Sequence, residues 1–517
     1  MSPSCTAYFI MEEKDWFRIK KYPHIGRPLS MADKGWVTRY VTDEDKVAAH
    51  HFYPLIHRDK TVRKYRRKIA SDGKRSKLRY ASSKPRELYY ANHFDANVYS
   101  YYAKLLSDAY NDKLERLGIE SCVTSYRRIK INPNNSNSSH KSNSDFAADV
   151  FNFILQHEEE HLIAITFDIK SFFDTLKHTK LKKAMCQVLD VTTLRKDYYN
   201  VFKNITKFSY INENEIFNEF SDDILVRTKS GIIKKAKVKK RRYLRNQNAI
   251  AYCETADFKK KILGNKLVIC NFFTEPKSKT PRTVGIPQGS PISAVLANLY
   301  MLNFDQRING YVSEIGGLYR RYSDDMVVIC SANYKDKILH LFEEAISERE
   351  LEIQTGKTQV FEFIKTDGKY VCGQKFGEHV HPHKNFEYLG FEFDGHHSFI
   401  KAASLSGFYR KMKRAVFKGA FYSKIDKSKS GIFRSRLYRK FSYKGADRKR
   451  IYGKDPADET KWVVTHKYNW GNFISYANLA HNKLPNNKIN GQVSRHWNIL
   501  NRLIAKKDYV KPPAVTL

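Results

Sequence analysis

The sequence predicts an α+β fold, because short runs of β-forming residues are interspersed with segments of helical periodicity. Residues 163–174 form an apolar run that ends in an aspartate. Residues 320–330 place two adjacent carboxylates before a second run of β-formers, a pattern typical of a hairpin. A glycine- and proline-containing loop at 284–291 runs into a helix-forming segment at 292–298. Two strands that end in carboxylates can converge on a metal ion, which would hold such repelling charges together.

Two longer segments have the spacing of amphipathic helices. One segment, residues 145–156, stands directly before the first apolar run. The other, residues 93–117, places apolar side chains near 3.6-residue intervals, at Phe94, Val98, Tyr102, Leu105 and Leu106. Between these segments, residues 132–139 are polar and cannot bury a core, so we expect an exposed loop there.

Composition and charge restrict the class of partner. The chain has 517 residues, a hydrophobic fraction of 41% and a net charge of +38, so it can bury a sizeable core but needs a polyanionic partner, which we expect to be nucleic acid. We find no signal peptide and no apolar run near the roughly 18 residues of a spanning helix, so we expect no membrane partner. The seven scattered cysteines favour a reduced, cytoplasmic setting.

Asp324 and Asp325 alone would indicate only a solvated turn. What changes that interpretation is the third stretch, the glycine- and proline-containing loop at 284–291 that runs into a helix-forming segment. Acidic residues that hold two metal ions are what nucleotidyl transfer needs, since one ion activates the attacking 3′-oxygen and the other steadies the leaving pyrophosphate. Mg²⁺ prefers such hard oxygen ligands.

The three stretches together resemble the palm of a reverse transcriptase, in the family's order. Phe167-Asp168 through Phe173 is similar to the first palm motif, residues 286–291 to the second, Tyr322-Ser323-Asp324-Asp325 to the Tyr-x-Asp-Asp box, residues 351–358 to the fourth motif and residues 388–391 to the primer grip. Ordered matches of this kind are far more specific than any one motif. The resemblance implies a right-hand polymerase with fingers, a palm of antiparallel sheet and helices, and a basic helical thumb.

The resemblance also implies the metal site. Asp168 and Asp324 would ligate the ions, the carbonyl of Ile169 would assist, and Asp325 would complete the carboxylate cluster. These three aspartates would be the catalytic residues. The implied cofactor is two Mg²⁺ ions, with Mn²⁺ as the alternative.

The residues that would bind the incoming nucleotide are Arg86, Ser171, Phe172, Phe173, Gln288 and Lys357. Arg86 would hold the triphosphate, although an arginine there could equally brace the following helix. Backbone amides of Ser171 and Phe172 would bind its oxygens, Gln288 would brace the base and sugar, and Lys357 would protonate pyrophosphate. Phe173 would exclude a ribose 2′-hydroxyl. The alternative role for Phe173 is that of a core aromatic, because adjacent residues of a strand face opposite sides and only one of the two phenylalanines can face inward. Tyr388, Leu389 and Gly390 would form the primer grip.

The predicted division has an N-terminal extension at 1–60, fingers at 61–160, a palm at 161–395 and a thumb at 396–517. The palm carries a basic insertion at about 212–283, richest in lysine and arginine at 234–245, for which a solvated hairpin and a surface for RNA or a neighbouring subunit are both open. Basic clusters at 63–77 and 410–450 would contact the template backbone and the duplex phosphates.

The function implied is an RNA-directed DNA polymerase, most similar to the bacterial defence-associated, unknown-group reverse transcriptases. That group implies protection against phage in the bacterial cytoplasm, with dNTPs as substrates, a DNA product, and a structured noncoding RNA as template and scaffold. A homo-oligomer is a candidate assembly. The alternatives are a retron-type reverse transcriptase, an RNA-dependent RNA polymerase, which the bulk of Phe173 disfavours, and an RNA-binding scaffold without polymerase activity.

Overall fold

The computed structural model of the chain contains two compact units. The structure describes residues 16–69, 75–135, 138–228, 230–262, 267–271, 280–377, 379–382, 384–425, 431–447, 449–454, 462–469 and 471–508. Within these ranges, the first unit consists of residues 16–127, 166–327 and 336–358, and the second of residues 128–165, 328–335 and those from 359 onward. No helix in the described ranges has the length and apolar character needed to cross a membrane.

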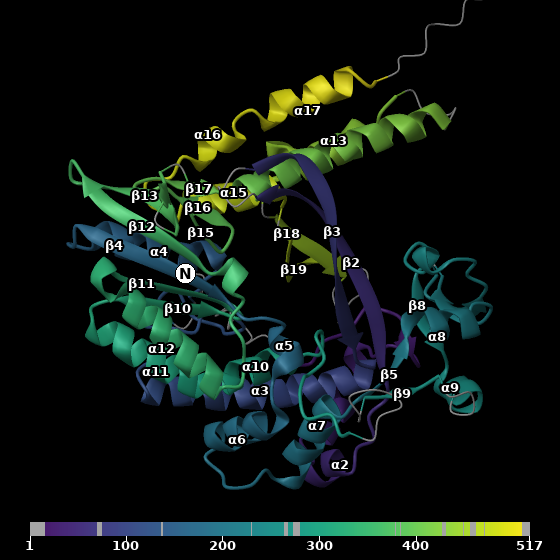
Figure 1. Cartoon of the computed structure of the whole chain (residues 1–517). Helices are drawn as coiled ribbons and strands as arrows, with labels where there is room; N and C mark the ends of the chain where they lie inside the picture. Colours follow the sequence, from purple (N-terminus) through teal and green to yellow (C-terminus); the bar gives the residue numbers. More distant parts are fainter. Residues whose placement is uncertain are drawn as a thin grey trace, which may run out of the picture. The chain divides into compact units, whose positions relative to one another are not determined.

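A six-stranded sheet has the strand order β10-β11-β4-β12-β13-β14 (Figure 1). Its strands are β4 (His161–Asp168), β10 (Leu318–Tyr322), β11 (Asp325–Ser331), β12 (Gln359–Thr366), β13 (Lys369–Phe376) and β14 (His379–His381). Residues 326–331 are all buried, as expected for a continuous apolar run. The hairpin predicted at the adjacent aspartates is confirmed. The strand predicted in the run 163–174 is confirmed as far as Asp168, whereas Phe172–Thr175 form a short helix. The division between the units crosses β4 and β11, and residues 166–168 and 325–327 belong to the first unit.

Helices make up much of the first unit. Helix α3 (His93–Arg116) confirms the segment predicted at 93–117; it begins where the Asn92 side chain accepts a hydrogen bond from the Phe94 N–H, and it buries Val98, Tyr102 and Leu106. The other helices are α1 (Lys34–Val41), α2 (Glu44–Ala48), α5 (Phe172–Thr175), α6 (His178–Val188), α7 (Lys196–Thr206), α8 (Glu213–Glu219), α9 (Thr255–Ile262), α10 (Ser293–Tyr300), α11 (Leu302–Glu314) and most of α12 (Lys335–Glu348). Helix α10 confirms the helix predicted after the glycine- and proline-containing loop.

A long antiparallel hairpin, visible as the two purple strands of Figure 1, joins β2 (Leu55–Ile69) to β3 (Arg75–Tyr90). It belongs to a sheet of order β3-β2-β5-β9, with β5 (Ser209–Asn212) and β9 (Ile269–Cys270). The basic cluster predicted at 63–77 falls on this hairpin. The side chains of that cluster lie outside the described residues, so its predicted contact with the template stays a prediction.

The region predicted as a basic insertion shares a hydrophobic core with Ile25 and Ile56, and it contains a hairpin, one of the two alternatives left open, formed by β6 (Ile224–Arg227) and β7 (Ile233–Ala236). The sheet order is β1-β8-β6-β7, in which β8 (Ala249–Cys253) pairs in parallel with β1 (His24–Ile25) from the N-terminal segment. Ion pairs join lysines or arginines of 234–245 to nearby carboxylates: Lys235 to Asp257, Lys237 to Asp222 and Arg241 to Glu213. Local carboxylates therefore offset part of the insertion's positive charge.

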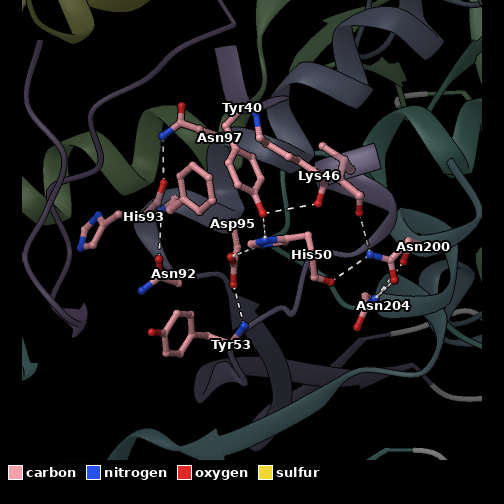
Figure 2. Close-up of polar contacts among 12 residues, drawn as sticks. Tyr40, Lys46, His50, Tyr53, Asn92, His93, Asp95, Asn97, Asn200 and Asn204 are labelled. Atoms are coloured by element: carbon pink, nitrogen blue, oxygen red, sulfur yellow. Dashed lines mark hydrogen bonds and ion pairs between the residues drawn. The ribbon is translucent and has the colours of Figure 1, made fainter. Parts of the chain in front are cut away.

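The described part of the N-terminal segment is built into the first unit (Figure 2). Asp95 of α3 is fully buried, and its carboxylate accepts hydrogen bonds from the Tyr53 N–H at 2.8 Å and contacts the His50 ring at 3.0 Å. The Asn200 side-chain amide of α7 donates to the carbonyls of Val47 and His50. Burial raises the pKa of Asp95, although the hydrogen bond from His50 opposes that rise. Residues 40–53 are thus tied to two helices rather than appended to them.

The second unit contains α4 (Asn143–Gln156), which confirms the helix predicted at 145–156 and stacks Phe151 on Phe393 at 4.8 Å. Its three-stranded sheet has the order β15-β16-β17, formed by β15 (Phe386–Tyr388), β16 (Phe391–Phe393) and β17 (Ser398–Ile400). Further along the chain lie α13 (Ala402–Ile425), α14 (Arg434–Phe441), α15 (Phe473–His481), α16 (Ile489–Val493) and α17 (His496–Ala505). A two-stranded sheet, β18 (Lys449–Lys454) with β19 (Trp462–Asn469), interrupts these helices, and the sequence analysis did not predict it.

Candidate active site

The predicted metal-binding aspartates lie at the ends of two neighbouring strands or in the turn beside them. Asp168 is the last residue of β4, Asp325 is the first residue of β11, and β4 and β11 are adjacent in the sheet. Because residues 166–168 and 325–327 belong to the same compact unit, we infer that both carboxylates lie at one end of the sheet. Asp324 is half-buried and Asp325 is exposed.

The turn before Asp324 holds a strained residue. Ser323 has φ of 63°, in the left-handed region that non-glycine residues rarely adopt, and it is only 5% exposed. Its N–H donates to the Ser125 hydroxyl at 2.7 Å, and its own hydroxyl accepts from the Tyr126 hydroxyl at 3.3 Å. Surrounding groups thus fix the backbone conformation that presents Asp324.

A buried polar cluster lies directly behind this turn; we call Ser125, Asn298, Asp305 and Arg321 the turn anchor. Arg321 of β10 is fully buried and donates to both carboxylate oxygens of Asp305 in α11, at 2.7 and 2.6 Å. It also donates to the Asn298 side chain at 3.0 Å and to the Ser323 carbonyl at 3.2 Å. Burial disfavours the charged guanidinium, but the Asp305 carboxylate outweighs that effect and raises the pKa of Arg321.

Asp168 already contacts a cation, the ammonium of Lys357. The Lys357 Nζ donates to the two Asp168 oxygens at 2.9 and 3.0 Å, and the Asp168 side chain is 17% exposed. The backbone beside Asp168 is fixed too, since the Gln354 N–H donates to its carbonyl and buried Ile169 bridges Ile353. The segment predicted as the fourth palm motif therefore lies beside the segment predicted as the first.

The loop after Asp168 has the same backbone strain as the turn before Asp324. Ser171 has φ of 49° and precedes the short helix α5. Phe172 is buried and Phe173 is half-buried, but both lie on helix α5 and not on a strand, so the strand alternation expected of them does not apply. The Ile286 N–H donates to the Phe173 carbonyl at 2.9 Å, so the first and second palm motifs are in contact.

Gln288 is joined to the end of β3, the second strand of the long hairpin. Its carbonyl accepts a hydrogen bond from the Tyr89 N–H at 2.8 Å. At Gly289 (φ 115°), an added Cβ would lie 2.7 Å from the Tyr89 carbonyl oxygen, so only glycine fits this approach. Arg86 is exposed on β3, opposite Lys60 of β2. The predicted nucleotide-binding residues thus all belong to the first unit.

The predicted primer grip belongs to the second unit and forms a tight turn between β15 and β16. Tyr388 is 5% exposed, and both Leu389 (φ 45°) and Gly390 (φ 93°) are left-handed. The Gly390 carbonyl accepts from the Lys401 N–H at 3.0 Å, which ties the turn to the start of α13. The turn is therefore held by a residue of the predicted thumb segment, Lys401.

The donor chemistry fits Mg²⁺, because the three aspartates offer hard carboxylate oxygens and Asp168 accepts a cation on both of its oxygens. In the part of the chain that the structure describes, only His57, Asp59 and Glu87 bring three His, Cys, Asp or Glu ligand atoms within 4.8 Å of one another. The three aspartates are not gathered to that degree.

Sequence reasoning missed the turn anchor. Arg321 follows Arg320, and such pairs usually lie on a solvated surface. The available signal was the two-residue period of β10, which places Arg321 on the face of the buried Tyr319. An arginine on the buried face of a strand requires a carboxylate partner, and Asp305 supplies it.

Residues 237–393 match the family model described as "Reverse transcriptase (RNA-dependent DNA polymerase)". The matched range contains Gln288, Asp324, Asp325, Lys357 and the primer grip, whereas Arg86 and Asp168 precede it. The match covers less than half of the chain and shows that these residues are similar to RNA-dependent DNA polymerases. With the mixed sheets and helices, it fits the predicted α+β right-hand polymerase fold.

Among solved structures, the chain is similar to apo telomerase from Candida tropicalis truncated from its C-terminal domain, with 12% identity over 70% of this chain and 57% of that chain and a TM-score of 0.32. It is also similar to telomerase from Candida albicans in complex with a TWJ fragment of telomeric RNA, with 13% identity over 70% of this chain and 48% of that chain and a TM-score of 0.36. The chain spans about half the length of these telomerase chains. No curated protein matches the sequence.

Proposed function

We propose that this chain is a reverse transcriptase that copies RNA into DNA at the aspartates of β4 and β11. The observation that carries the proposal is the placement of these carboxylates: Asp168 ends one strand, and Asp324 lies in the strained turn before its neighbour. The match of residues 237–393 to the reverse transcriptase family supports the same chemistry.

Two Mg²⁺ ions, with Mn²⁺ as the alternative, would activate the primer 3′-oxygen and neutralise the leaving pyrophosphate when bound. Asp168 and Asp324 would hold them through carboxylate oxygens, the Ile169 carbonyl would assist, and Asp325 would add negative charge beside them. The turn anchor fixes the backbone of Ser323, the residue before Asp324, which would limit the movement of Asp324 during the reaction.

The incoming dNTP would bind around α5. Amides of Ser171 and Phe172 at the left-handed bend would face the triphosphate, since oriented N–H groups bind anions. Half-buried Phe173 would occupy the space of a ribose 2′-hydroxyl. Gln288 would brace the base and sugar, and exposed Arg86 would hold the triphosphate from the fingers hairpin.

Lys357 would serve two successive roles. In the structure its ammonium neutralises Asp168. When a divalent cation occupies Asp168, we propose that the ammonium is released toward the triphosphate, where it can protonate pyrophosphate. The backbone at 353–357 is tied to the segment around Asp168, which keeps the lysine beside that carboxylate.

The broader role that we propose is phage defence in the bacterial cytoplasm, with a structured noncoding RNA as template and scaffold. The net charge of +38 supports an RNA partner larger than one short duplex. The thumb would hold the duplex, and Tyr388, Leu389 and Gly390 would position the primer end. The chain would also assemble into a homo-oligomer.

The test is primer extension on an RNA template by the full chain, comparing wild type with Asp324→Asn combined with Asp325→Asn. The amides keep the shape but lose the anionic ligands, so extension should disappear while RNA affinity is retained. The matched control is Asp108→Asn with Asp112→Asn, which removes two exposed carboxylates from α3 and should extend normally. Unchanged extension by the Asp324 and Asp325 variant would reject the site. A preference of the wild type for ribonucleotides would replace the proposal with an RNA-dependent RNA polymerase.

A further inference from the structure

A cavity of about 820 Å³ opens in the second unit between α13, α14 and the start of α15. Its lining includes four cationic side chains, Lys411, Arg436, Arg439 and Lys440, and no aspartate or glutamate. Phenylalanines form another part of the wall, with Phe408 and Phe473 stacked at 4.5 Å between ring centroids and 17° between planes. The cavity therefore combines concentrated positive charge with an aromatic wall.

The positive charge of this cavity has no carboxylate to balance it. Among the described residues, none of the four cations forms an ion pair, whereas Arg434, also on α14, is paired with Asp508 at 2.6 Å. Four like charges around one space repel each other, and this repulsion falls when an anion occupies the space. Arginine and lysine together favour phosphate oxygens as that anion.

The wall on the α15 side is held in place before any ligand binds. Asn472 caps α15 and donates to the carbonyls of Arg439 and Ser442, at 3.1 and 2.7 Å. At Gly445 an added Cβ would lie 1.8 Å from the Arg439 carbonyl oxygen, so no side chain fits this close approach. A cavity with fixed walls loses little conformational entropy on binding, which favours a specific ligand over a diffuse polyanion.

We propose that this cavity binds one unpaired nucleotide of the RNA partner, with its phosphates on the four cations and its base against half-buried Phe473. The volume lies in the range of small-molecule sites and suits a single nucleotide rather than a duplex. Stacking on an aromatic ring is open to every base, so we expect selection for an unpaired nucleotide and not for its sequence. The inference rests on the proposed RNA partner but not on polymerisation.

The experiment measures RNA binding by fluorescence anisotropy in the background of Asp324→Asn with Asp325→Asn, so that its outcome is independent of catalysis. Two RNA hairpins with the same stem are compared, one fully paired and one with a single bulged nucleotide. The bulged RNA should bind about 5- to 150-fold more tightly, the range expected for stacking of one base. Phe473→Leu should abolish this preference while leaving affinity for the paired hairpin unchanged.

The charge component is tested with Lys411→Ala combined with Arg439→Ala. A plot of log K for the bulged RNA against the logarithm of the salt concentration has a negative slope. This double substitution should reduce the magnitude of that slope by about 1.4, the value for two contacts to single-stranded phosphates. Arg410→Ala with Lys413→Ala removes two exposed charges of α13 that do not line the cavity, and it should leave the preference for the bulge intact. Free adenosine monophosphate is a separate arm, and competition by it at micromolar concentration would identify a free nucleotide as the ligand instead.

A second readout does not depend on the variants folding. A 4-thiouridine at the bulge of the RNA should photocrosslink to peptides that contain Phe408 or Phe473. Crosslinks confined to other segments, or a bulge preference that Phe473→Leu leaves unchanged, would overturn the proposal. Loss of primer extension with this preference intact would count against the proposed active site alone.

Discussion

Asp305 accepts hydrogen bonds from Arg321 on both carboxylate oxygens, and neither side chain has any exposed surface. The pair lies outside the predicted catalytic motifs, yet Arg321 also donates to the carbonyl of Ser323, the residue before Asp324. Removal of one partner leaves a buried charge uncompensated, which costs about 3–5 kcal/mol. The geometry of the candidate site and the stability of the first unit therefore depend on the same ion pair.

We expect Asp305→Asn to destabilise the chain by about 3–5 kcal/mol, measured by urea unfolding. The double variant Asp305→Leu with Arg321→Met should recover most of that loss, because an apolar pair of similar volume avoids the unpaired charge. Its rate of primer extension should still fall at least about tenfold, since the Ser323 carbonyl loses its donor and Asp324 is no longer fixed. Wild-type extension by the stable double variant would show that the pair serves stability alone.

Phe173→Val should raise ribonucleotide incorporation relative to deoxynucleotide incorporation by about tenfold or more, because the truncated side chain no longer fills the space of the 2′-hydroxyl. Phe172→Val is the matched control. Phe172 is 3% exposed, so its truncation should cost stability without changing sugar selection. Competition between the two nucleotide types in single-nucleotide extension measures the ratio. Relaxed selection in the Phe172 variant alone would move the assignment by one residue.

Lys357→Met should strengthen divalent-cation binding at the active site, because the ammonium no longer competes for Asp168. A half-exposed ion pair contributes about 0.2–1 kcal/mol, so the dissociation constant for Mn²⁺ should fall about 1.4- to 5-fold, as measured by titration with electron paramagnetic resonance. Lys170→Met, which breaks the exposed pair with Glu352, should leave this constant unchanged. Weaker Mn²⁺ binding in the Lys357 variant would mean that the lysine supports the ion and does not replace it.

His93→Phe should reduce the sensitivity of the first unit to acid. His93 is 2% exposed, its ring lies against Tyr22, and burial with the nearby Lys20 charge lowers its pKa to about 4. The unfolded chain takes up this proton near pH 6.5, so stability is lost as the pH falls from 6.5 toward 4. Between pH 7.5 and 5.0 this linkage amounts to about 2 kcal/mol.

Urea unfolding measures the free energy of unfolding at pH 7.5 and at pH 5.0. Between these two pH values, the Phe variant should lose about 2 kcal/mol less of this free energy than wild type. Buried His24, whose pKa burial lowers to about 3, keeps its own contribution in both proteins. His51→Gln, at an exposed histidine, should behave as wild type. Equal acid sensitivity of wild type and the Phe variant would mean that His93 takes up its proton near pH 6.5 in the folded chain as well, contrary to this account.

The sequence predicted the strands around the aspartates because apolar runs and an adjacent carboxylate pair are local signals. The fingers hairpin gave no such signal, since residues 58–68 are dominated by lysine and arginine and lack apolar alternation. The ion pair of the turn anchor could not be predicted from the sequence, because Arg321 and Asp305 meet only through the packing of β10 on α11. Local patterns therefore predicted the chemistry of the site, whereas its rigid support depends on tertiary contacts.

The pairing of β1 with β8 has a consequence for how the chain is made. His24 pairs with Ala251, which lies 227 positions further along the chain, so this length must be synthesised before the two strands can meet. At a synthesis rate of about 5–20 residues per second, this delay is roughly 10–45 s. During it, the buried surface of Ile25 has no native partner on β8. The nascent N-terminal segment would therefore be a natural client for ribosome-associated chaperones, and slower translation ahead of codon 251 should lengthen that exposure.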